Sequence, residues 1–189
     1  MKIIPLVSAV LLLATFVSAQ ADADRLVQRM QDGGHVLMLR HAYAPGSGDP
    51  AGFRLGDCRT QRTLNERGRA QATAIGEWLK ARGIARARVF SSQWCRCLET
   101  AERLGLGPVT PLPALNSFFQ RPRDREPNLA DLRRFLAEQP RDGELIVLVT
   151  HFVTIAGITG EGVGSGEGVV LDLDTGPPYP AVGRLSFDR

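Results

Sequence analysis

The chain has 189 residues, of which 43% are hydrophobic and 23% charged, and its formal net charge is +3. This length and composition are typical of one globular domain with a buried core. Because the net charge is small and no run of lysine or arginine forms a tail or stripe, nothing indicates nucleic-acid binding.

The chain begins with the pattern of a targeting segment. A lysine stands near the start, residues 3–17 are almost wholly apolar, and small residues then allow cleavage after Ala19 or Ala21. The apolar stretch is short for a membrane span and polar residues follow it directly. We therefore expect residues 1–21 to be a cleavable signal peptide and residues 22–189 to be one domain. The mature protein is then periplasmic or secreted, without stable membrane insertion.

The remaining segments alternate between helical and strand patterns. In chain order the sequence predicts a helix over 24–31, a strand over 36–39, a long loop over 43–62, a helix ending near 81, a strand over 88–91, a helix over 93–104, an irregular excursion over 107–127, a helix over 128–138, a strand over 145–149, a helix over 153–158, and closing strands over 169–173 and 182–187. Strands that are apolar on both faces and alternate with helices predict an α/β three-layer sandwich with a mostly parallel central sheet.

Polar residues stand where three of the predicted strands end. The first strand ends in Arg40-His41, the second leads into Arg96 in the first turn of the next helix, and the third ends in Thr150-His151. Parallel sheets bind ligands at the carboxyl ends of their strands. We therefore expect these two arginines and two histidines to lie on the same edge of the sheet.

This set of side chains suits phosphoryl transfer. A neutral imidazole is a competent nucleophile. The transferring group carries negative charge on its oxygens, which guanidinium groups and the N–H groups of a helix N-terminus stabilise. Two neighbouring arginines disfavour an imidazolium, so the pKa of His41 is expected to be depressed. No acidic cluster that would hold a metal is evident, and we expect neither a metal nor another cofactor.

Four segments together carry a family resemblance. Residues 40–42, Arg-His-Ala, resemble the Arg-His-Gly signature of the histidine phosphatase superfamily, with alanine in place of glycine. Residues 91–101 look like its second motif, in which an arginine opens a helix, and residues 149–151 match the strand that carries its second histidine. Residues 64–72 resemble the first long helix of the family.

The resemblance covers nearly all of the chain after the expected signal peptide and implies a phosphoglycerate mutase-like fold. It implies that His41 is the nucleophile that becomes phosphorylated and that Arg40, Arg96 and His151 bind the phosphoryl oxygens. It extends to the exported phosphatases that act on the heptose phosphate of the lipopolysaccharide core, and to the small phosphohistidine phosphatases.

Export argues against a glycolytic mutase and against a cytoplasmic phosphorelay. Our interpretation is therefore a phosphatase that acts on a small phosphorylated substrate, a sugar or envelope phosphomonoester. The alternatives are a protein phosphohistidine phosphatase and a catalytically weak module that binds a phosphate ligand on the same fold. The oligomeric state is not indicated by the sequence.

The sequence departs from the family at the general acid. Members that resemble acid phosphatases carry an aspartate directly after the second histidine, where this chain has Phe152. Mutase-like members carry a glutamate in the middle loop, where residues 115–119 contain no carboxylate. Asp57, Asp124 and Glu126 are the candidate general acids, although surface carboxylates in loops are common and usually structural. A substrate with a good leaving group would need no acid.

The long loop carries further candidates for binding an anion. Arg54, Arg59 and Arg62 lie in it, either as substrate-binding residues or as solvated charges.

Three cysteines would meet an oxidising compartment after export, which allows one disulfide and one remaining thiol. We expect Cys58 to pair with Cys95, tying the long loop to the helix that carries Arg96. Cys97 then points elsewhere, because positions two apart on a helix differ by about 200°. Pairing of Cys58 with Cys97 stays open as the alternative.

Cys97 and Arg103 also have the spacing of cysteine-dependent tyrosine phosphatases. The residues between them favour a helix and include two glutamates that would repel an anion, so this class is not favoured.

Overall fold

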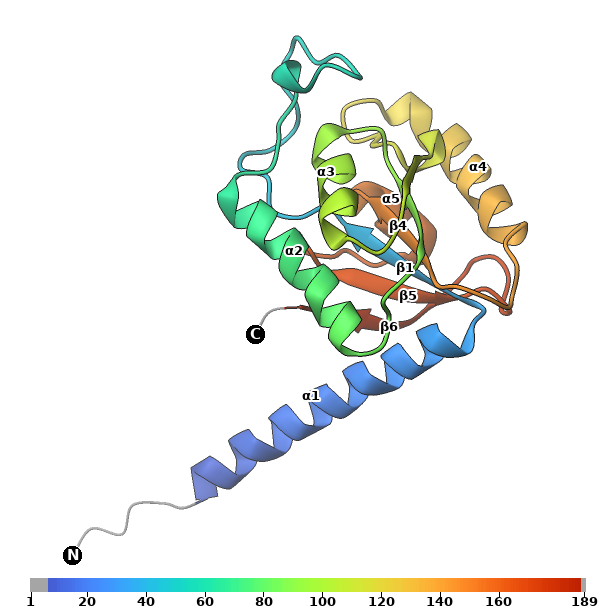
Figure 1. The fold of residues 1–189 in the computed structure, drawn as a ribbon. Coiled ribbons are helices and arrows are strands. Elements are labelled where there is room, and N and C mark those ends of the chain that lie inside the picture. The colour runs from blue at the N-terminus through green and yellow to red at the C-terminus, as the bar shows by residue number, and fades with distance from the viewer. Residues whose placement is uncertain (1–6, 188–189) are drawn as a thin grey trace, which may run out of the picture.

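The computed structural model describes the backbone of residues 7–187 and the side chains of residues 20–187. A sheet of six strands forms its centre, with helices on both faces (Figure 1). The strands are β1 (His35–Arg40), β2 (Arg88–Ser91), β3 (Val109–Pro111), β4 (Ile146–Thr150), β5 (Gly168–Asp172) and β6 (Ala181–Leu185). The helices are α1 (Val7–Asp32), α2 (Glu66–Ala81), α3 (Cys95–Leu104), α4 (Arg125–Ala137) and α5 (Phe152–Thr159). Three short 3-10 turns cover Cys58–Thr60, Pro113–Leu115 and Pro122–Asp124.

The strands are arranged in the order β3-β2-β4-β1-β5-β6. The first four are parallel to their neighbours, β5 is antiparallel to β1, and β6 is antiparallel to β5. Along β1, Leu37 and Leu39 belong to the hydrophobic core beneath α1, α2 and α3, whereas Val36 and Met38 belong to the core beneath α4 and α5. Helices thus cover both faces of the sheet, which confirms the predicted three-layer α/β sandwich with a mostly parallel sheet.

Helix α1 ends where the sequence predicts, at two glycines with positive φ angles of 94° and 67° at Gly33 and Gly34. It begins much earlier than residue 24, so the predicted cleavage sites after Ala19 and Ala21 lie inside it. Residues 1–6 of the predicted signal peptide lie outside the described residues. Among the α1 side chains that the structure describes, those buried in the core, Leu26 among them, follow both predicted sites. In the described part of the chain, no helix combines the length and apolarity that crossing a membrane requires.

The excursion predicted as irregular over 107–127 contains a strand that the sequence does not reveal. The edge strand β3 pairs in parallel with β2, with Val109 opposite Val89. Proline at position 111 conceals it, because proline is tolerated only at sheet edges and strand ends. Helix α4 also begins at Arg125, three residues before the predicted start at residue 128. Pro127 lies in its first turn, where an amide hydrogen is not needed.

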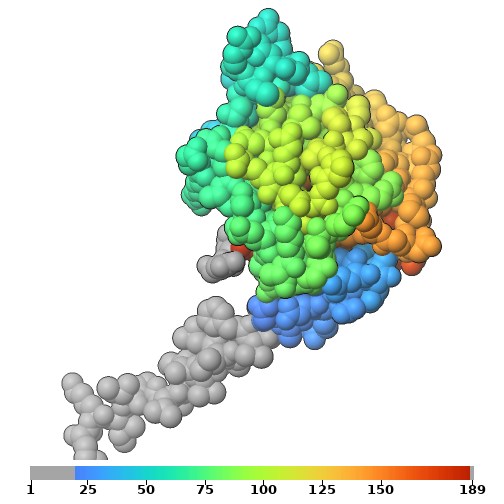
Figure 2. All heavy atoms as spheres, viewed as in Figure 1, coloured from blue at the N-terminus to red at the C-terminus, as the bar shows by residue number. Residues whose placement is uncertain are grey.

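The segment between β1 and α2 is a long loop, as predicted. Its tip, which contains the 3-10 turn Cys58–Thr60, stands out from the body of the molecule in Figure 2. The loop is nevertheless fastened to the domain: a disulfide joins Cys58 to Cys95, and the side chain of Gln61 accepts a hydrogen bond from the Cys95 amide at 3.0 Å. The last part of the loop is thereby held beside the N-terminus of α3.

Candidate active site

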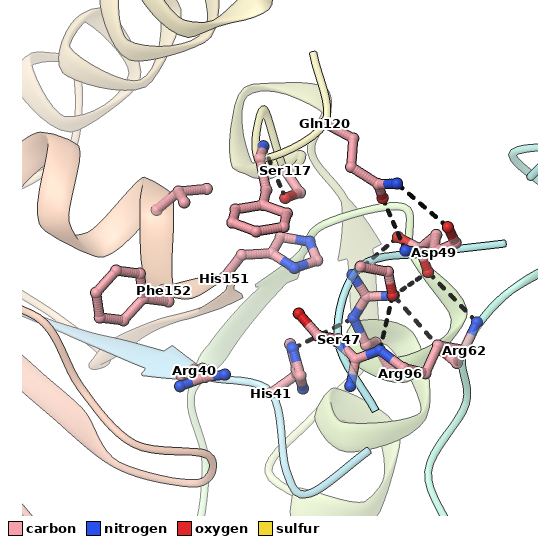
Figure 3. A pocket seen from close by; sticks show the side chains of 13 residues that line it. Arg40, His41, Ser47, Asp49, Arg62, Arg96, Ser117, Gln120, His151 and Phe152 are labelled. Carbon is pink, nitrogen blue, oxygen red and sulfur yellow. Dashed lines mark hydrogen bonds and ion pairs between the residues drawn. The ribbon is translucent and has the colours of Figure 1, made fainter. Parts of the chain in front are cut away.

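A cavity of about 140 Å³ opens at the carboxyl ends of the parallel strands (Figure 3). The β1–β4 register places Arg40 opposite Thr150, so that His41 and His151 follow side by side at the same edge. Their ring centroids are 5.5 Å apart. The lining residues are Arg40, His41, Ser47, Gly48, Asp49, Arg62, Arg96, Ser117, Phe119, Gln120, His151, Phe152 and Val153. The structure thus brings together the two arginines and two histidines expected at this edge.

The His41 ring is buried and its orientation is set by the backbone. Its Nδ1 lies 2.8 Å from the carbonyl oxygen of Ala42. Because a carbonyl oxygen only accepts, Nδ1 carries the proton and Nε2 carries the lone pair. The Nε group of Arg96 donates to this Nε2 at 3.2 Å. Burial, followed by the charges of Arg96 and Arg40, lowers the pKa of His41 to about 3, so the ring is neutral at physiological pH.

Arg96 is held by a carboxylate that the sequence does not single out. Its Nη1 and Nη2 atoms donate to the two oxygens of Asp49 at 2.7 and 3.2 Å, and both side chains are buried. Asp49 also accepts from the Trp94 indole at 2.9 Å and from the Arg62 amide at 3.3 Å. Burial alone would raise the pKa of Asp49, but the hydrogen bonds from Arg96 and Trp94 outweigh it and lower that pKa. Asp49 therefore remains a carboxylate that fixes the Arg96 fork.

Two further arginines approach the cavity. Arg40 is half-buried and its Nη1 donates to the carbonyl of Val163 at 2.9 Å. Arg62 donates to the carbonyls of Gly48 and Ala44, which folds the start of the long loop around it. Burial and the charge of Arg96 lower the pKa of both guanidinium groups, although they stay charged throughout the physiological range.

The two other arginines predicted in the long loop lie outside the cavity lining. Arg54 and Arg59 are exposed and pair with Asp57, which also caps the 3-10 turn at Cys58. Of the three candidate substrate-binding arginines, the structure places only Arg62 in the cavity.

The second histidine is oriented by a chain of polar side chains. His151 Nε2 lies 2.9 Å from the Ser92 hydroxyl, and that hydroxyl lies 3.2 Å from Asn116 Oδ1. Asn116 Oδ1 accepts from the Gln93 amide at 2.9 Å, so the hydroxyl donates to Asn116 and accepts from a proton on His151 Nε2. The Nδ1 atom of His151 is then the unprotonated one. Burial, followed by the neighbouring His41 imidazole and the positive charge of Arg96, holds the pKa of His151 well below its ordinary value.

None of the three candidate general acids lines the cavity. Asp57 is bound by Arg59 and Arg54, Asp124 is paired with Arg123, and Glu126 is paired with Arg125. Asp49 is the carboxylate that does line it.

The cysteines divide as one disulfide and one thiol. Cys58 is bonded to Cys95, and Cys97 is a buried free cysteine whose Sγ lies 3.4 Å from His151 Nε2. Burial raises the pKa of the Cys97 thiol to about 12, and Arg103 pairs with Glu99, so the cysteine-phosphatase interpretation has no site. Among the described residues, no group of three or more His, Cys, Asp or Glu side chains is placed to hold a metal ion.

Comparison with known proteins agrees with this geometry. The model of the histidine phosphatase superfamily (branch 1) matches residues 36–118, which include Arg40, His41 and Arg96 but end before His151. No curated protein matches the chain. Residues 36–118 are therefore similar to the histidine phosphatase superfamily, and the motifs that carry the likeness are the ones that line the cavity.

Solved structures share the fold. The protein histidine phosphatase SixA, complexed with tungstate, is 19% identical, with a TM-score of 0.56 over 81% of this chain and 97% of that chain. A mycobacterial glucosyl-3-phosphoglycerate phosphatase, complexed with VO3, is 20% identical, with a TM-score of 0.53 over 72% of this chain and 92% of that chain. At this level of identity the likeness establishes the architecture alone.

Proposed function

We propose that this protein is a phosphatase that transfers the phosphoryl group of a phosphomonoester to Nε2 of His41 and then to water. The observation that carries the proposal is the tautomer of His41. Its Nδ1 proton is committed to the Ala42 carbonyl, so Nε2 carries the lone pair in a cavity lined by three arginines. That lone pair accepts from Arg96 Nε at 3.2 Å, and Nε2 attacks phosphorus once this donor has turned to a phosphoryl oxygen. In the first step the Nε2–P bond forms and the bond from phosphorus to the leaving oxygen breaks. Water then attacks phosphorus and the Nε2–P bond breaks.

The surrounding groups have distinct tasks in this mechanism. The fork of Arg96, fixed by Asp49, and the guanidinium of Arg40 offset the charge on the phosphoryl oxygens. His151 donates from Nδ1 to an oxygen only when it is protonated, because its other proton is held by Ser92. A bound phosphate dianion favours that protonation by its charge. The mechanism uses no metal ion.

The expected setting of the enzyme is outside the cytoplasm. The signal-peptide pattern of residues 1–21 and the Cys58–Cys95 disulfide both suit an oxidising compartment. A small sugar or envelope phosphate is the substrate class that this location favours. A protein phosphohistidine phosphatase is the second candidate, favoured by the absence of a free carboxylate in the cavity. A weakly catalytic module that binds a phosphate ligand is the third.

The decisive experiment is trapping of the phosphoenzyme. Brief reaction with a labelled phosphomonoester in excess chelator should leave acid-labile phosphate on His41, found by mapping peptides at neutral or alkaline pH. His41→Ala should lower kcat by at least about 1,000-fold and abolish labelling, because it removes the nucleophile. His35→Ala is the matched control, since His35 lies at the start of β1 outside the cavity lining. This variant should retain both the kcat and the labelling of the unmodified protein.

Full turnover by His41→Ala would overturn the proposed nucleophile. Loss of labelling in chelator that added metal restores would replace the mechanism with a metal-dependent one. Tight binding of phosphate without any turnover would favour the binding module.

A further inference from the structure

We infer that the site takes aryl phosphates, which are phosphomonoesters of an aromatic alcohol, and releases the alcohol without protonating it. The inference rests on the proposed function and narrows its substrate, away from the sugar phosphates that location alone suggests. Two features of the cavity carry it: its carboxylate is already engaged, and exposed aromatic rings line it.

No group in the cavity is set to protonate a leaving oxygen. Asp49 accepts from both Arg96 Nη atoms, from the Trp94 indole and from the Arg62 amide, which leaves a buried carboxylate without a proton. His151 directs its Nε2 proton to Ser92, behind the cavity. The leaving oxygen therefore departs with the electron pair of the P–O bond and remains an anion.

The acidity of the alcohol decides whether such a departure is fast. A phenolic hydroxyl has a pKa near 10, as in tyrosine. Water has a pKa of about 15.7, and simple alcohols lie close to it. The phenolate is thus the better leaving anion by about five or six powers of ten in acidity, and rates of such steps follow the acidity of the leaving group.

The cavity also offers a surface for an aromatic ring. Among the described residues the exposed large hydrophobic side chains are Phe119 at 60%, Phe152 at 46% and Leu55 at 45% exposure. Both phenylalanines line the cavity, and Leu55 does not. Figure 3 shows Phe152 on the opposite side of the cavity from Asp49 and Arg62.

The two sides of the cavity therefore differ in chemistry. One side presents Arg62 and Arg96, whose Nη atoms also hold Asp49, and these guanidinium groups suit the phosphoryl oxygens. Arg40 lies beside the ring of Phe152, with its guanidinium carbon 5.8 Å from the ring centroid. On the other side apolar ring surface is exposed to water, and an aromatic group bound there would remove it from water. An aryl phosphate has this distribution of charge and apolar surface, whereas a sugar phosphate carries hydroxyl groups where the rings lie.

The test compares substrates that separate ring recognition from leaving-group acidity. The value of kcat/KM is measured for phenyl phosphate, tyrosine phosphate, glycerol 3-phosphate, glucose 6-phosphate and a fluorinated alkyl phosphate whose alcohol is about as acidic as phenol. We expect the aryl esters to exceed glycerol and glucose phosphates by at least about 100-fold. The aryl esters should also exceed the fluorinated ester, which has a comparable leaving group but no ring.

Variants then assign the ring preference to the cavity. Phe119→Ala should lower kcat/KM for phenyl phosphate by about 5- to 10-fold, mainly through KM, because the lost contact is with the bound ring. The same variant should lower kcat/KM for the fluorinated alkyl ester by a smaller factor than for phenyl phosphate, because that ester has no ring to lose the contact. Leu55→Ala, the matched control, should leave every substrate unchanged.

Asp49→Asn tests the assignment of the carboxylate. If Asp49 only positions Arg96, the variant lowers kcat/KM by the same factor for phenyl and glycerol phosphates. A loss confined to glycerol phosphate would make Asp49 the general acid and overturn the inference.

The inference would also be overturned if glucose 6-phosphate or glycerol 3-phosphate were turned over as fast as the aryl esters or faster. The same holds if Phe119→Ala lowered kcat/KM by the same factor for the aryl esters and the fluorinated alkyl ester. These outcomes leave the phosphoenzyme on His41 intact, so they are distinguishable from failure of the proposed function.

Discussion

At the scale of single residues, the fold holds two neighbouring histidines neutral at one end of the sheet. His41 and His151 are both buried, and each is also close to the positive charge of Arg96. An unfolded chain imposes no such restriction, because both imidazoles are then solvated with ordinary pKa values near 6.5. The site is therefore maintained at a cost in stability that depends on pH.

The free energy of unfolding should fall as the pH is lowered below about 6.5. The pKa of His41 is about 3 in the folded state, so between these two pH values the unfolded state binds more protons. The cost is absent above pH 6.5 and grows by about 1.4 kcal/mol per pH unit for each such histidine as the pH falls. Urea unfolding followed from pH 7.5 to pH 5 measures this slope. His41→Gln removes one titrating group and should flatten it; an unchanged slope would show that His41 titrates normally in the fold.

The sequence predicts the site residues that follow strands and misses Asp49, which lies in a loop. Arg40, His41 and His151 are found by the rule that parallel strands end at one edge, since the strands before them are unmistakably apolar. Asp49 lies in an irregular loop between Gly48 and a proline, and its partner Arg96 is 47 positions away. No local pattern encodes that contact, and it becomes evident only when the loop is folded over α3.

At the scale of elements, the pair α2 and α3 depends on a glycine at their contact. A Cβ atom added to Gly76 would lie 2.1 Å from the carbonyl oxygen of Leu104, at the end of α3. Backbone cannot yield as a flexible side chain does, so the two helices would have to separate. Arg96 lies in the first turn of α3, so a displacement of this helix would move Arg96 in the cavity.

Gly76→Ala should therefore destabilise the protein by about 3 kcal/mol, even though alanine is the better helix former by about 1 kcal/mol. The free energy of unfolding in urea measures the effect. Gly52→Ala provides the comparison, because a Cβ there meets nothing within 4 Å and the backbone has no positive φ. A Gly76 variant as stable as the Gly52 variant would contradict the close packing of the two helices.

Most elements are predictable because they bury apolar residues with a clear period. β4 is buried at all five positions, and each of its residues is either β-branched or leucine. β3 is concealed because it is three residues long, lies at the sheet edge and is only partly buried. For α1 the sequence separates a targeting segment from a short helix, whereas the backbone is one continuous helix from Val7. An apolar N-terminal segment of this kind is compatible both with a signal peptide and with the first part of a long helix.

At the scale of the whole molecule, the disulfide joins the long loop between β1 and α2 to helix α3. Cys58 and Cys95 are 37 positions apart, and the segment between them includes Arg62, while Asp49 lies earlier in the same long loop as Cys58. Without the bond, the tip of the loop would be free to leave α3, and Asp49 would be less firmly held against Arg96. An oxidising compartment permits the Cys58–Cys95 bond, and the bond in turn keeps Asp49 close to Arg96.

Replacing both Cys58 and Cys95 with serine should lower the free energy of unfolding by about 3–4 kcal/mol, the chain-entropy value for a closed loop of this length. It should also raise KM, because the loop that orients Arg96 becomes less ordered. Cys97→Ser is the control, because Cys97 is not part of the disulfide. Peptide maps of this variant made without reduction should still show Cys58 linked to Cys95. A map showing Cys58 linked to Cys97, or three free thiols, would contradict the pairing.

The register between β1 and β4 has a consequence for how the molecule folds. The hydrogen bonds that complete the cavity join residues 55 and 59 positions apart, His41 with Arg96 and Ser92 with His151. Contacts of such sequence separation form late, after the closure of long loops, and parallel strands are slow to pair. A collapsed intermediate that lacks the β1–β4 pairing therefore has helices but no anion site. An oxyanion such as phosphate then recognises only the finished molecule and stabilises it in proportion to RT ln(1 + [L]/Kd), without assisting any earlier stage.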